Sequence, residues 1–176
     1  MHSGPTGIIA SSVNGVIVRN NISDALAGIF DAAPAVRVSD NTLTNTSFGV
    51  LLLGGGTVQS NDISNANYGV FLNTDGATVQ SNHITLATTA AVEFNCHSGV
   101  VSHNTINDVA VGLDMVPAGF HGFNSFANTG TITTEGCGAA PLMIGAARAQ
   151  SRVGVQSGTT NPQQWRMPAT PFGARK

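Results

Sequence analysis

Charged residues are scarce in this sequence, and so are aromatic residues and long apolar runs. Asp, Glu, Lys and Arg make up 9% of the 176 residues, whereas about a quarter is usual in soluble domains. The absence of any run of about 18 apolar residues excludes a transmembrane helix of ordinary length. The segment after Met1 is neither basic nor apolar, so we expect no signal peptide in this chain. The apolar residues also lack a helical period, which argues against a helical protein.

The residues that replace charge are those typical of strands and turns. Val, Ile and Thr favour strands, whereas Gly, Asn and Ser favour tight turns. The hydrophobic fraction is an ordinary 41%, which at this length is enough for one domain with a real core. Intrinsic disorder is disfavoured, because it goes with high net charge and few β-branched residues.

The few charges are unevenly distributed along the chain. Residues 1–137 hold nine acidic residues against Arg19 and Arg37, a formal charge of −7, and residues 138–176 hold five basic residues and no acidic one. A basic tail can contact nucleic acid or a membrane, but the acidic body argues against nucleic acid. We therefore expect neither a nucleic-acid partner nor a membrane partner.

A repeat of about 20 residues is the strongest signal in the sequence. Asparagine recurs at spacings of 20, 20, 21, 22 and 20 residues, at Asn21, Asn41, Asn61, Asn82, Asn104 and Asn124. A valine stands three residues before each of the first five, the first of them Val18, and an apolar residue closely follows all six. A second marker precedes each asparagine by 12 to 14 residues: Gly7-Ile8, Gly28-Ile29, Gly49-Val50, Gly69-Val70, Ala91-Val92 and Gly112-Leu113. Two markers that keep phase over six repeats indicate six copies of one structural unit.

Within each repeat, apolar residues alternate with a period of two, as in a strand that buries every second side chain. The alternating pairs are Val50 and Leu52, Val70 and Leu72, Val92 and Phe94, and Leu113 and Met115. Each repeat is therefore predicted to form one coil, whose strands pair with those of the coils above and below. The asparagine amides are expected to stack from coil to coil at a tight turn.

These repeats resemble those of parallel β-helix proteins of the pectate-lyase-like superfamily, which carry Gly-Val/Ile followed by Val-x-x-Asn-x-Ile. The resemblance covers residues 7 to about 130 and implies an all-β, single-stranded right-handed parallel β-helix of about six rungs. It leaves the activity open, because the superfamily holds polysaccharide lyases, hydrolases, epimerases, phage tailspikes and non-enzymatic modules. We assign residues 1–137 to the β-helix and residues 138–176 to a C-terminal cap segment with an extended basic tail.

Two cysteines, Cys96 and Cys137, leave the redox compartment open. In the repeat register they lie about two rungs apart, roughly 10 Å at about 4.8 Å per rung. This separation disfavours a disulfide unless the last segment folds back.

Candidate site residues are the outward members of the strand after each Gly-Val marker. The first outward position is occupied by Phe30, Leu51, Phe71, Glu93 and Asp114, and the second by Leu53, Asn73, Asn95 and Val116. An apolar stripe, consisting of Phe30, Leu51 and Phe71, is thus expected to lead to two carboxylates. Glu93 and Asp114 should lie about 5 Å apart, close enough to raise one pKa and form an acid–base pair. That separation is also typical of retaining glycosidases.

A sugar chain fits such a face, because the apolar faces of its rings stack on aromatic side chains. We predict Glu93, Asp114 and His97 as catalytic residues and Phe30, Leu51, Phe71, Asn73 and Asn95 as substrate-binding residues, with no cofactor and no metal. Two other interpretations stay open. The carboxylates can be solvated surface residues, and the stripe can be a subunit interface or a seat for the tail.

Other polar residues cluster near the asparagines. Asp62 and His83 should stack on adjacent rungs, as an acid–base pair or as a surface ion pair. His97, His103 and His121 share no spacing typical of metal ligands, so we expect no metal site.

Comparison with the superfamily lowers the case for a uronate lyase. Such lyases place an arginine or lysine near acidic ligands, but Arg19 and Arg37 lie at least three rungs from Glu93, about 14 Å. The Asp-Pro-His-Asp signature of alginate epimerases and the clustered aspartates of polygalacturonases are absent. Our first expectation is therefore a carbohydrate-active or carbohydrate-binding protein, and, if catalytic, a glycoside hydrolase that acts on a neutral polysaccharide.

The alternative is a non-catalytic structural β-helix, of surface-protein or phage tail-fibre type, or a fragment of a larger secreted protein. The apolar stripe and the open ends of the helix would then support a homo-oligomer. In either case the resemblance implies a parent protein that is extracellular or periplasmic.

Overall fold

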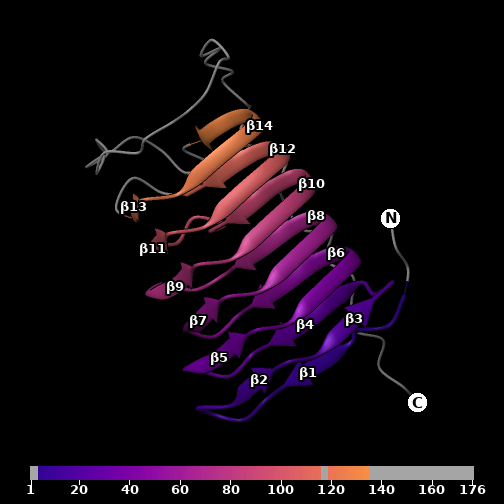
Figure 1. Ribbon diagram of the computed structural model, residues 1–176. Helices are drawn as coiled ribbons and strands as arrows, with labels where there is room; N and C mark the ends of the chain where they lie inside the picture. The colour runs from indigo at the N-terminus through magenta and orange to yellow at the C-terminus, as the bar shows by residue number, and fades with distance from the viewer. Residues whose placement is uncertain (1–3, 116–118, 135–176) are drawn as a thin grey trace.

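The computed structural model describes residues 4–115 and 119–134, so the expectations for Val116 and for residues 138–176 fall outside these ranges. Strands make up all the regular structure of the described part, and every pairing between them is parallel. The chain winds as stacked coils from β1 to β14 (Figure 1). This arrangement confirms the predicted all-β parallel solenoid of about six turns.

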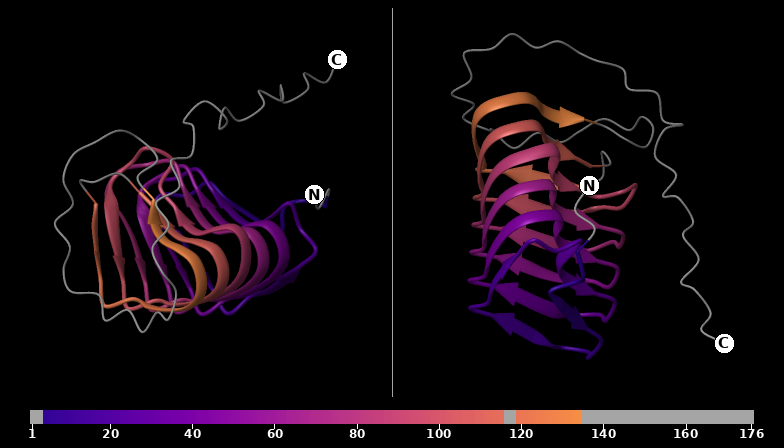
Figure 2. Two further views of the ribbon diagram at one scale, coloured as in Figure 1. Left: turned by 90° about the horizontal axis from the view of Figure 1, so that it is seen from above. Right: turned by 90° about the vertical axis from the view of Figure 1, so that its right-hand side faces the viewer.

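Two sheets run along the solenoid axis. The first consists of β1 (Ile8–Ala10), β3 (Asn21–Ser23), β4 (Ala27–Asp31), β6 (Thr42–Leu52), β8 (Asp62–Leu72), β10 (His83–Glu93), β12 (Thr105–Asp114) and β14 (Ser125–Thr134). The second consists of β2 (Val16–Val18), β5 (Val36–Ser39), β7 (Gly56–Gln59), β9 (Ala77–Gln80), β11 (Gly99–Ser102) and β13 (Phe120–Gly122). The long strands of the first sheet curve around a corner of each coil (Figure 2).

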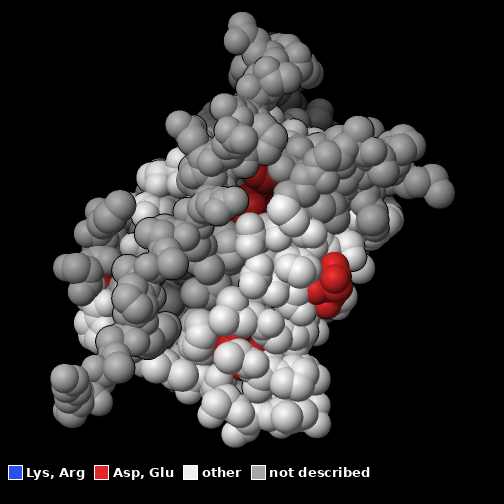
Figure 3. All heavy atoms as spheres, turned by 180° about the vertical axis from the view of Figure 1, so that it is seen from behind, with Lys and Arg blue, Asp and Glu red and all other residues white. Residues whose placement is uncertain are grey.

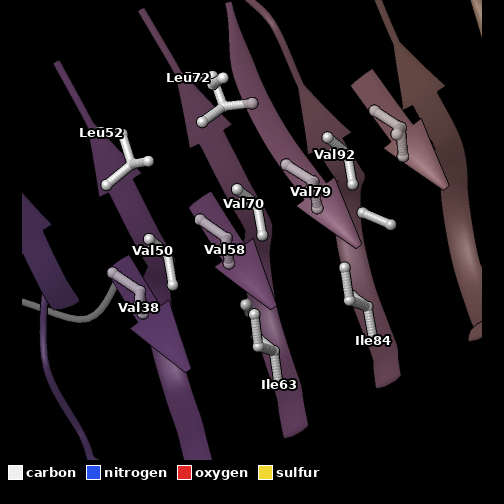
Figure 4. Close-up of a cluster of buried hydrophobic side chains, with 14 of the residues drawn as sticks. Val38, Val50, Leu52, Val58, Ile63, Val70, Leu72, Val79, Ile84 and Val92 are labelled. Atoms are coloured by element: carbon white, nitrogen blue, oxygen red, sulfur yellow. The ribbon is translucent and has the colours of Figure 1, made fainter. Parts of the chain in front are cut away.

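The core consists of columns of apolar side chains that repeat from rung to rung. Register pairs Val50 with Val70 and Val70 with Val92, and all three are fully buried. Burial of one such side chain contributes about 1.5–3 kcal/mol, and like neighbours pack closely because each coil repeats the one below. The columns labelled in Figure 4 are Val38–Val58–Val79, Val50–Val70–Val92, Leu52–Leu72 and Ile63–Ile84.

The asparagine ladder is buried at the turn before each long strand. Asn61 is representative: its backbone N–H and its Nδ2 both donate to Oδ1 of Asn82, each at 2.9 Å. Its Nδ2 also donates to the backbone carbonyls of Val38 and Gln59. The amide is thereby satisfied inside the core, as a buried polar group must be.

The first member of the ladder is Asn20, so the predicted Asn21 is wrong by one residue. The Nδ2 and the backbone N–H of Asn20 both donate to Oδ1 of Asn41, whereas Asn21 pairs with Thr42. The error arises because two asparagines stand side by side, and both give an acceptable spacing. It shifts the preceding position too, since Ile17 rather than Val18 aligns with the core valines.

Left-handed residues mark two corners of each coil. One column directly precedes the ladder, with φ between 54° and 58°: Arg19, Asp40, Ser60, Ser81, His103 and Phe123. A second column follows the ladder by four residues, with φ between 49° and 58°: Asp24, Asn45, Asn65, Leu86, Asp108 and Asn128. Asn and Asp tolerate this conformation best, and here they also form an exposed second ladder, in which Nδ2 of Asn65 donates to Oδ1 of Asn45 at 2.6 Å. Leu86, which is 53% exposed, interrupts it.

The glycine of the second marker is required by the close approach of successive coils. A Cβ on Gly49 would lie 2.5 Å from the carbonyl oxygen of Gly69 and 2.6 Å from Cγ2 of Ile63. No real Cβ sits so close to a neighbour, so only glycine fits without a shift of the coil.

The strand β10 contains one residue more than its neighbours. Ala87–Ala90 spans three residue steps where Ala66–Tyr68 of β8 spans two, and the same excess appears against β12. The extra residue makes a β-bulge at Thr88 and Thr89, shortly before Glu93. Bulges of this kind redirect nearby side chains.

Two polar side chains occupy inward positions that are apolar in neighbouring coils. Asp31 aligns with Leu52 and is fully buried; its Oδ1 accepts from the N–H of Ala33, and its Oδ2 has no partner among the described residues. Burial raises the pKa of Asp31, although the Ala33 hydrogen bond lowers it in part. His121 aligns with Val101, and burial lowers its pKa. The alternation of apolar residues did not reveal either group.

Candidate functional site

The outward column predicted from the sequence exists as one continuous line across five rungs. Register joins its members in order, namely Phe30, Leu51, Phe71, Glu93 and Asp114. They therefore share one face of the solenoid, at about 4.8 Å per rung. The apolar stripe leads directly to the two carboxyl groups, as the alternation predicted.

Glu93 and Asp114, here called the carboxyl pair, are hydrogen-bonded to each other through their side chains. The two carboxyl groups therefore approach more closely than the predicted spacing near 5 Å. Burial, followed by the charge and the hydrogen bond of Asp114, raises the pKa of Glu93 to about 8. A hydrogen bond from the N–H of Asn95 to Oε1 of Glu93, at 3.3 Å, opposes this effect in part. Glu93 thus keeps its proton at neutral pH, because two adjacent carboxylates do not both ionise readily.

Three aromatic rings lie next to the carboxyl pair. Phe48 and Tyr68 stack with their centroids 5.3 Å apart and their planes inclined by 6°. Phe71 packs edge-on against both, at 5.4 and 5.3 Å. Phe71 is only 7% exposed, so it cannot offer the open ring surface predicted for it. Its place is taken by the partly exposed rings of Phe48 and Tyr68, because the curved strand β8 brings Tyr68 and Phe71 together.

Tyr68 connects the aromatic cluster to the carboxyl pair. Its side chain is hydrogen-bonded to Thr89, one of the bulge residues of β10. Burial raises the pKa of Tyr68, and the negative charges of Glu93 and Asp114 raise it further. The phenol therefore stays uncharged and lies within electrostatic range of both carboxyl groups.

The second outward position adds two amides to this face. Nδ2 of Asn95 donates to Oδ1 of Asn73 at 2.7 Å, so the two residues are joined across adjacent rungs. Leu53, one rung below, is 37% exposed. The predicted polar and apolar segments of this column are thus both present.

His97 lies in the turn after β10, where Asn95 and Cys96 have φ values of 29° and 68°. Its Nδ1 is 3.4 Å from Oδ2 of Asp75. The N–H and the hydroxyl of Ser98 donate to Oδ1 of Asp75 at 2.8 and 3.1 Å. The Ser98 N–H, followed by His97, lowers the pKa of Asp75. The ion-pair contact of His97 therefore leads to Asp75 and not to the carboxyl pair.

The remaining histidines form separate local contacts. Nδ1 of His83 lies 3.2 Å from Oδ1 of Asp62 on the adjacent rung, with both side chains at least half exposed. His103 stacks on Phe123, with centroids 5.2 Å apart, and His121 is buried in the core. Across residues 4–115 and 119–134, no group of three His, Cys, Asp or Glu side chains is placed to hold a metal ion.

Basic residues are distant from this face in the part of the chain that the structure describes. Only Arg19 and Arg37 occur there, just after β2 and within β5 of the second sheet. The face shown in Figure 3 carries acidic side chains and no visible Lys or Arg among its described atoms. An anionic ligand would therefore lack a charge partner beside the carboxyl pair. No helix among the described residues is long and apolar enough to cross a membrane.

Cys96 is disulfide-bonded, although the rung spacing disfavoured a disulfide. The only other cysteine, Cys137, lies outside the described residues. The spacing estimate treated Cys96 as part of a regular rung, whereas it occupies a left-handed position in a turn. The disulfide constrains the segment between Glu93 and His97 from one side.

Phe48, Tyr68 and Thr89 are the site residues that reasoning from the repeat missed. The alternation after each Gly-Val marker does not extend backward to Tyr68, which precedes Gly69. One signal was available: the markers Gly69 and Ala91 are 22 residues apart, but the corresponding ladder asparagines are 21 apart. The difference places one extra residue in this coil, where the bulge occurs.

Comparison with known proteins agrees with the geometry. The family described as right handed beta helix region matches residues 1–137, which include every described residue. No curated protein and no solved structure matches the chain. From the family match, the repeat and the stacked parallel coils, the chain belongs to the right-handed β-helix family.

Proposed function

We propose that this protein is a carbohydrate-active β-helix that hydrolyses a polysaccharide at the carboxyl pair. The observation that carries the proposal is a protonated carboxyl group hydrogen-bonded to a charged one, in line with an apolar and aromatic face. Glycoside hydrolysis needs two carboxyl groups with different protonation states, one as acid and one as nucleophile or base.

In this mechanism Glu93 donates its proton to the glycosidic oxygen, because its raised pKa keeps it protonated at neutral pH. Asp114 supplies the negative charge that attacks the anomeric carbon or activates a water molecule. The two groups exchange their mutual hydrogen bond for contacts with the substrate when the sugar enters. His97 stays a predicted third member, oriented by Asp75 in the adjacent turn.

The substrate we propose is a neutral polysaccharide. Phe30, Leu51 and the aromatic cluster would contact apolar ring faces, while Asn73 and Asn95 would hydrogen-bond to sugar hydroxyl groups. Neither described arginine lies near enough to pair with a uronate carboxylate. The proposal includes neither a nucleic-acid nor a membrane partner.

The test is a screen of the purified protein against soluble and insoluble polysaccharides. The measured quantities are binding by pull-down, new reducing ends, and unsaturated ends as the signature of a lyase. Glu93→Gln and Asp114→Asn should each abolish product formation. Asp62→Asn is the matched control, because Asp62 and His83 form another pair on adjacent rungs, away from the aromatic cluster.

Product formation that survives Glu93→Gln would refute the proposed role of the carboxyl pair. Unsaturated products would replace the hydrolase by a lyase. Neither binding nor product on any polysaccharide would favour the second candidate function.

That second candidate is a non-catalytic structural solenoid, of surface-protein or tail-fibre type. It is favoured by Ile9, which pairs with Phe30, extends the apolar stripe by one rung and is 68% exposed. A structural role predicts a defined oligomer through this stripe, measurable by size-exclusion chromatography with light scattering. Ile9→Lys should dissociate such an oligomer, and a monodisperse monomer at high concentration would count against it.

We also propose an extracellular or periplasmic location for the parent protein. The disulfide at Cys96 supports it, because disulfides persist mainly in oxidising compartments. Titration of free thiols in protein isolated without reductant tests this point, and a free thiol at Cys96 would remove the support.

A further inference from the structure

Tyr68 is the one tyrosine of the chain, and its hydroxyl has no role in packing the aromatic cluster. Phe48, on the adjacent rung of the same column, stacks against Tyr68 without a hydroxyl. A phenylalanine would therefore satisfy the ring contacts of Tyr68 equally well. A partly buried phenol is unfavourable unless its hydroxyl finds a polar partner, so the hydroxyl calls for an explanation of its own.

The position of this hydroxyl is fixed from three sides. The face of the ring stacks on Phe48, its side meets the edge-on ring of Phe71, and its side chain is hydrogen-bonded to Thr89. Thr89 belongs to the bulge of β10, four residues before Glu93. The extra residue of that coil therefore places a hydroxyl partner for Tyr68 on the strand that carries Glu93.

We infer that Tyr68 is a specificity-determining residue, whose hydroxyl acts with the carboxyl pair to bind neighbouring hydroxyl groups of a neutral sugar. This inference rests on the proposed function and assigns the class of ligand to the same site. The phenol donates one hydrogen bond, the protonated Glu93 donates another, and Asp114 accepts. A sugar diol satisfies all three, because each of its hydroxyl groups both donates and accepts.

Charged sugars fit this set of groups less well. A uronate would bring a third carboxylate beside Glu93 and Asp114, where the described residues provide no basic side chain. A protonated amino sugar would pair with Asp114 but would offer no acceptor to the phenol, since an ammonium group only donates. The neutral diol is the class that uses every polar group of the site.

The experiment compares binding of five hexasaccharides to the full chain by isothermal titration calorimetry. Three are neutral, the hexamers of β-1,4-linked glucose, xylose and mannose, and two are charged, the hexamers of galacturonate and glucosamine. Tyr68→Phe keeps the ring and removes the hydroxyl. Ser64→Ala is the matched control, since it removes another hydroxyl from β8, one that lies 3.4 Å from Oγ1 of Thr44. Thermal unfolding of each variant reports whether the fold is kept.

We expect a neutral hexamer to bind, and Tyr68→Phe to weaken that binding about tenfold, which corresponds to about 1.4 kcal/mol. Ser64→Ala should leave the affinity unchanged. Wild-type affinity in Tyr68→Phe, together with lost binding in Asp114→Asn, would remove the role of Tyr68 and leave the proposed function standing. Binding confined to a charged hexamer would overturn the neutral diol. If no hexamer binds, the proposed function fails and this inference fails with it.

Discussion

The carboxyl pair makes a stability prediction that can be measured without any substrate. The ordinary pKa of Glu93 is 4.5, and in the folded protein it is raised to about 8. Between these values the folded protein binds more protons than the unfolded chain, so its stability falls as the pH rises from about 4.5 to about 8. One pH unit corresponds to about 1.4 kcal/mol, which limits the total effect to about 5 kcal/mol. Relaxation around the ionised pair should reduce the effect to about 2–4 kcal/mol.

Glu93→Gln isolates this effect, because the amide cannot ionise but still donates a hydrogen bond to Asp114. The variant should match the wild type in free energy of unfolding at pH 5 and exceed it by about 2–4 kcal/mol at pH 9. Urea denaturation at pH 5, 7 and 9 measures the difference, in which the contributions of other groups cancel. Asp62→Asn, at an exposed pair, should change stability by less than about 1 kcal/mol. If Glu93→Gln changes stability equally at pH 5 and pH 9, the pair does not hold a shared proton, and Glu93 loses its place as the acid.

Three further predictions concern the coils themselves. Asn82→Ala should lower the free energy of unfolding by about 3–5 kcal/mol, because it removes the buried amide and leaves the donors of Asn61 unpaired; in urea denaturation the exposed Asn65→Ala should lose less than about 1 kcal/mol, and equal losses would contradict the ladder argument. Leu86→Asn should raise the thermal midpoint, by about 0.5–1 kcal/mol of stability, since Asn tolerates φ of 56° and completes the exposed ladder; a lower midpoint would show that Leu86 has an unseen role. His121→Val should stabilise the protein more at pH 5 than at pH 8, because burial lowers the pKa of His121 and the unfolded chain gains the proton below about 6.5; a gain independent of pH in urea titrations would mean that packing alone is responsible.

The coil, its strands and its inward columns could be predicted because the repeat states the same information six times. A position that is apolar in every coil can only be the core of a stacked structure. The exceptions are the positions where a coil departs from the average. Asp31 and His121 sit in inward columns that are otherwise apolar, and no pattern in a single sequence separates them from surface residues.

The candidate site was predictable only as far as parity reaches. Alternation places Glu93 and Asp114 on the outer face, and the rung spacing makes them neighbours. It does not give the direct hydrogen bond between them, which depends on side-chain conformation. It also assigns the open ring surface to Phe71, since parity cannot show that Phe48 and Tyr68 cover that ring. The disulfide at Cys96 was misjudged for a related reason, because turns do not follow the rung spacing.

The location of the bulge explains why the site arises in this part of an otherwise regular solenoid. Coils of one length repeat the same outward environment, and polar groups then stack in uniform columns such as the exposed second ladder. An inserted residue breaks that uniformity on one strand alone. In β10 the insertion places Thr89 against Tyr68, just before the strand ends with Glu93. Deletion of Thr88 should therefore restore the register between β8 and β10 and leave the coils stacked. It should nonetheless separate Tyr68 from its partner and weaken binding of a neutral hexasaccharide as strongly as Tyr68→Phe does. Undiminished binding in the deletion variant, with its fold verified by circular dichroism, would show that the irregular coil and the site coincide only by chance.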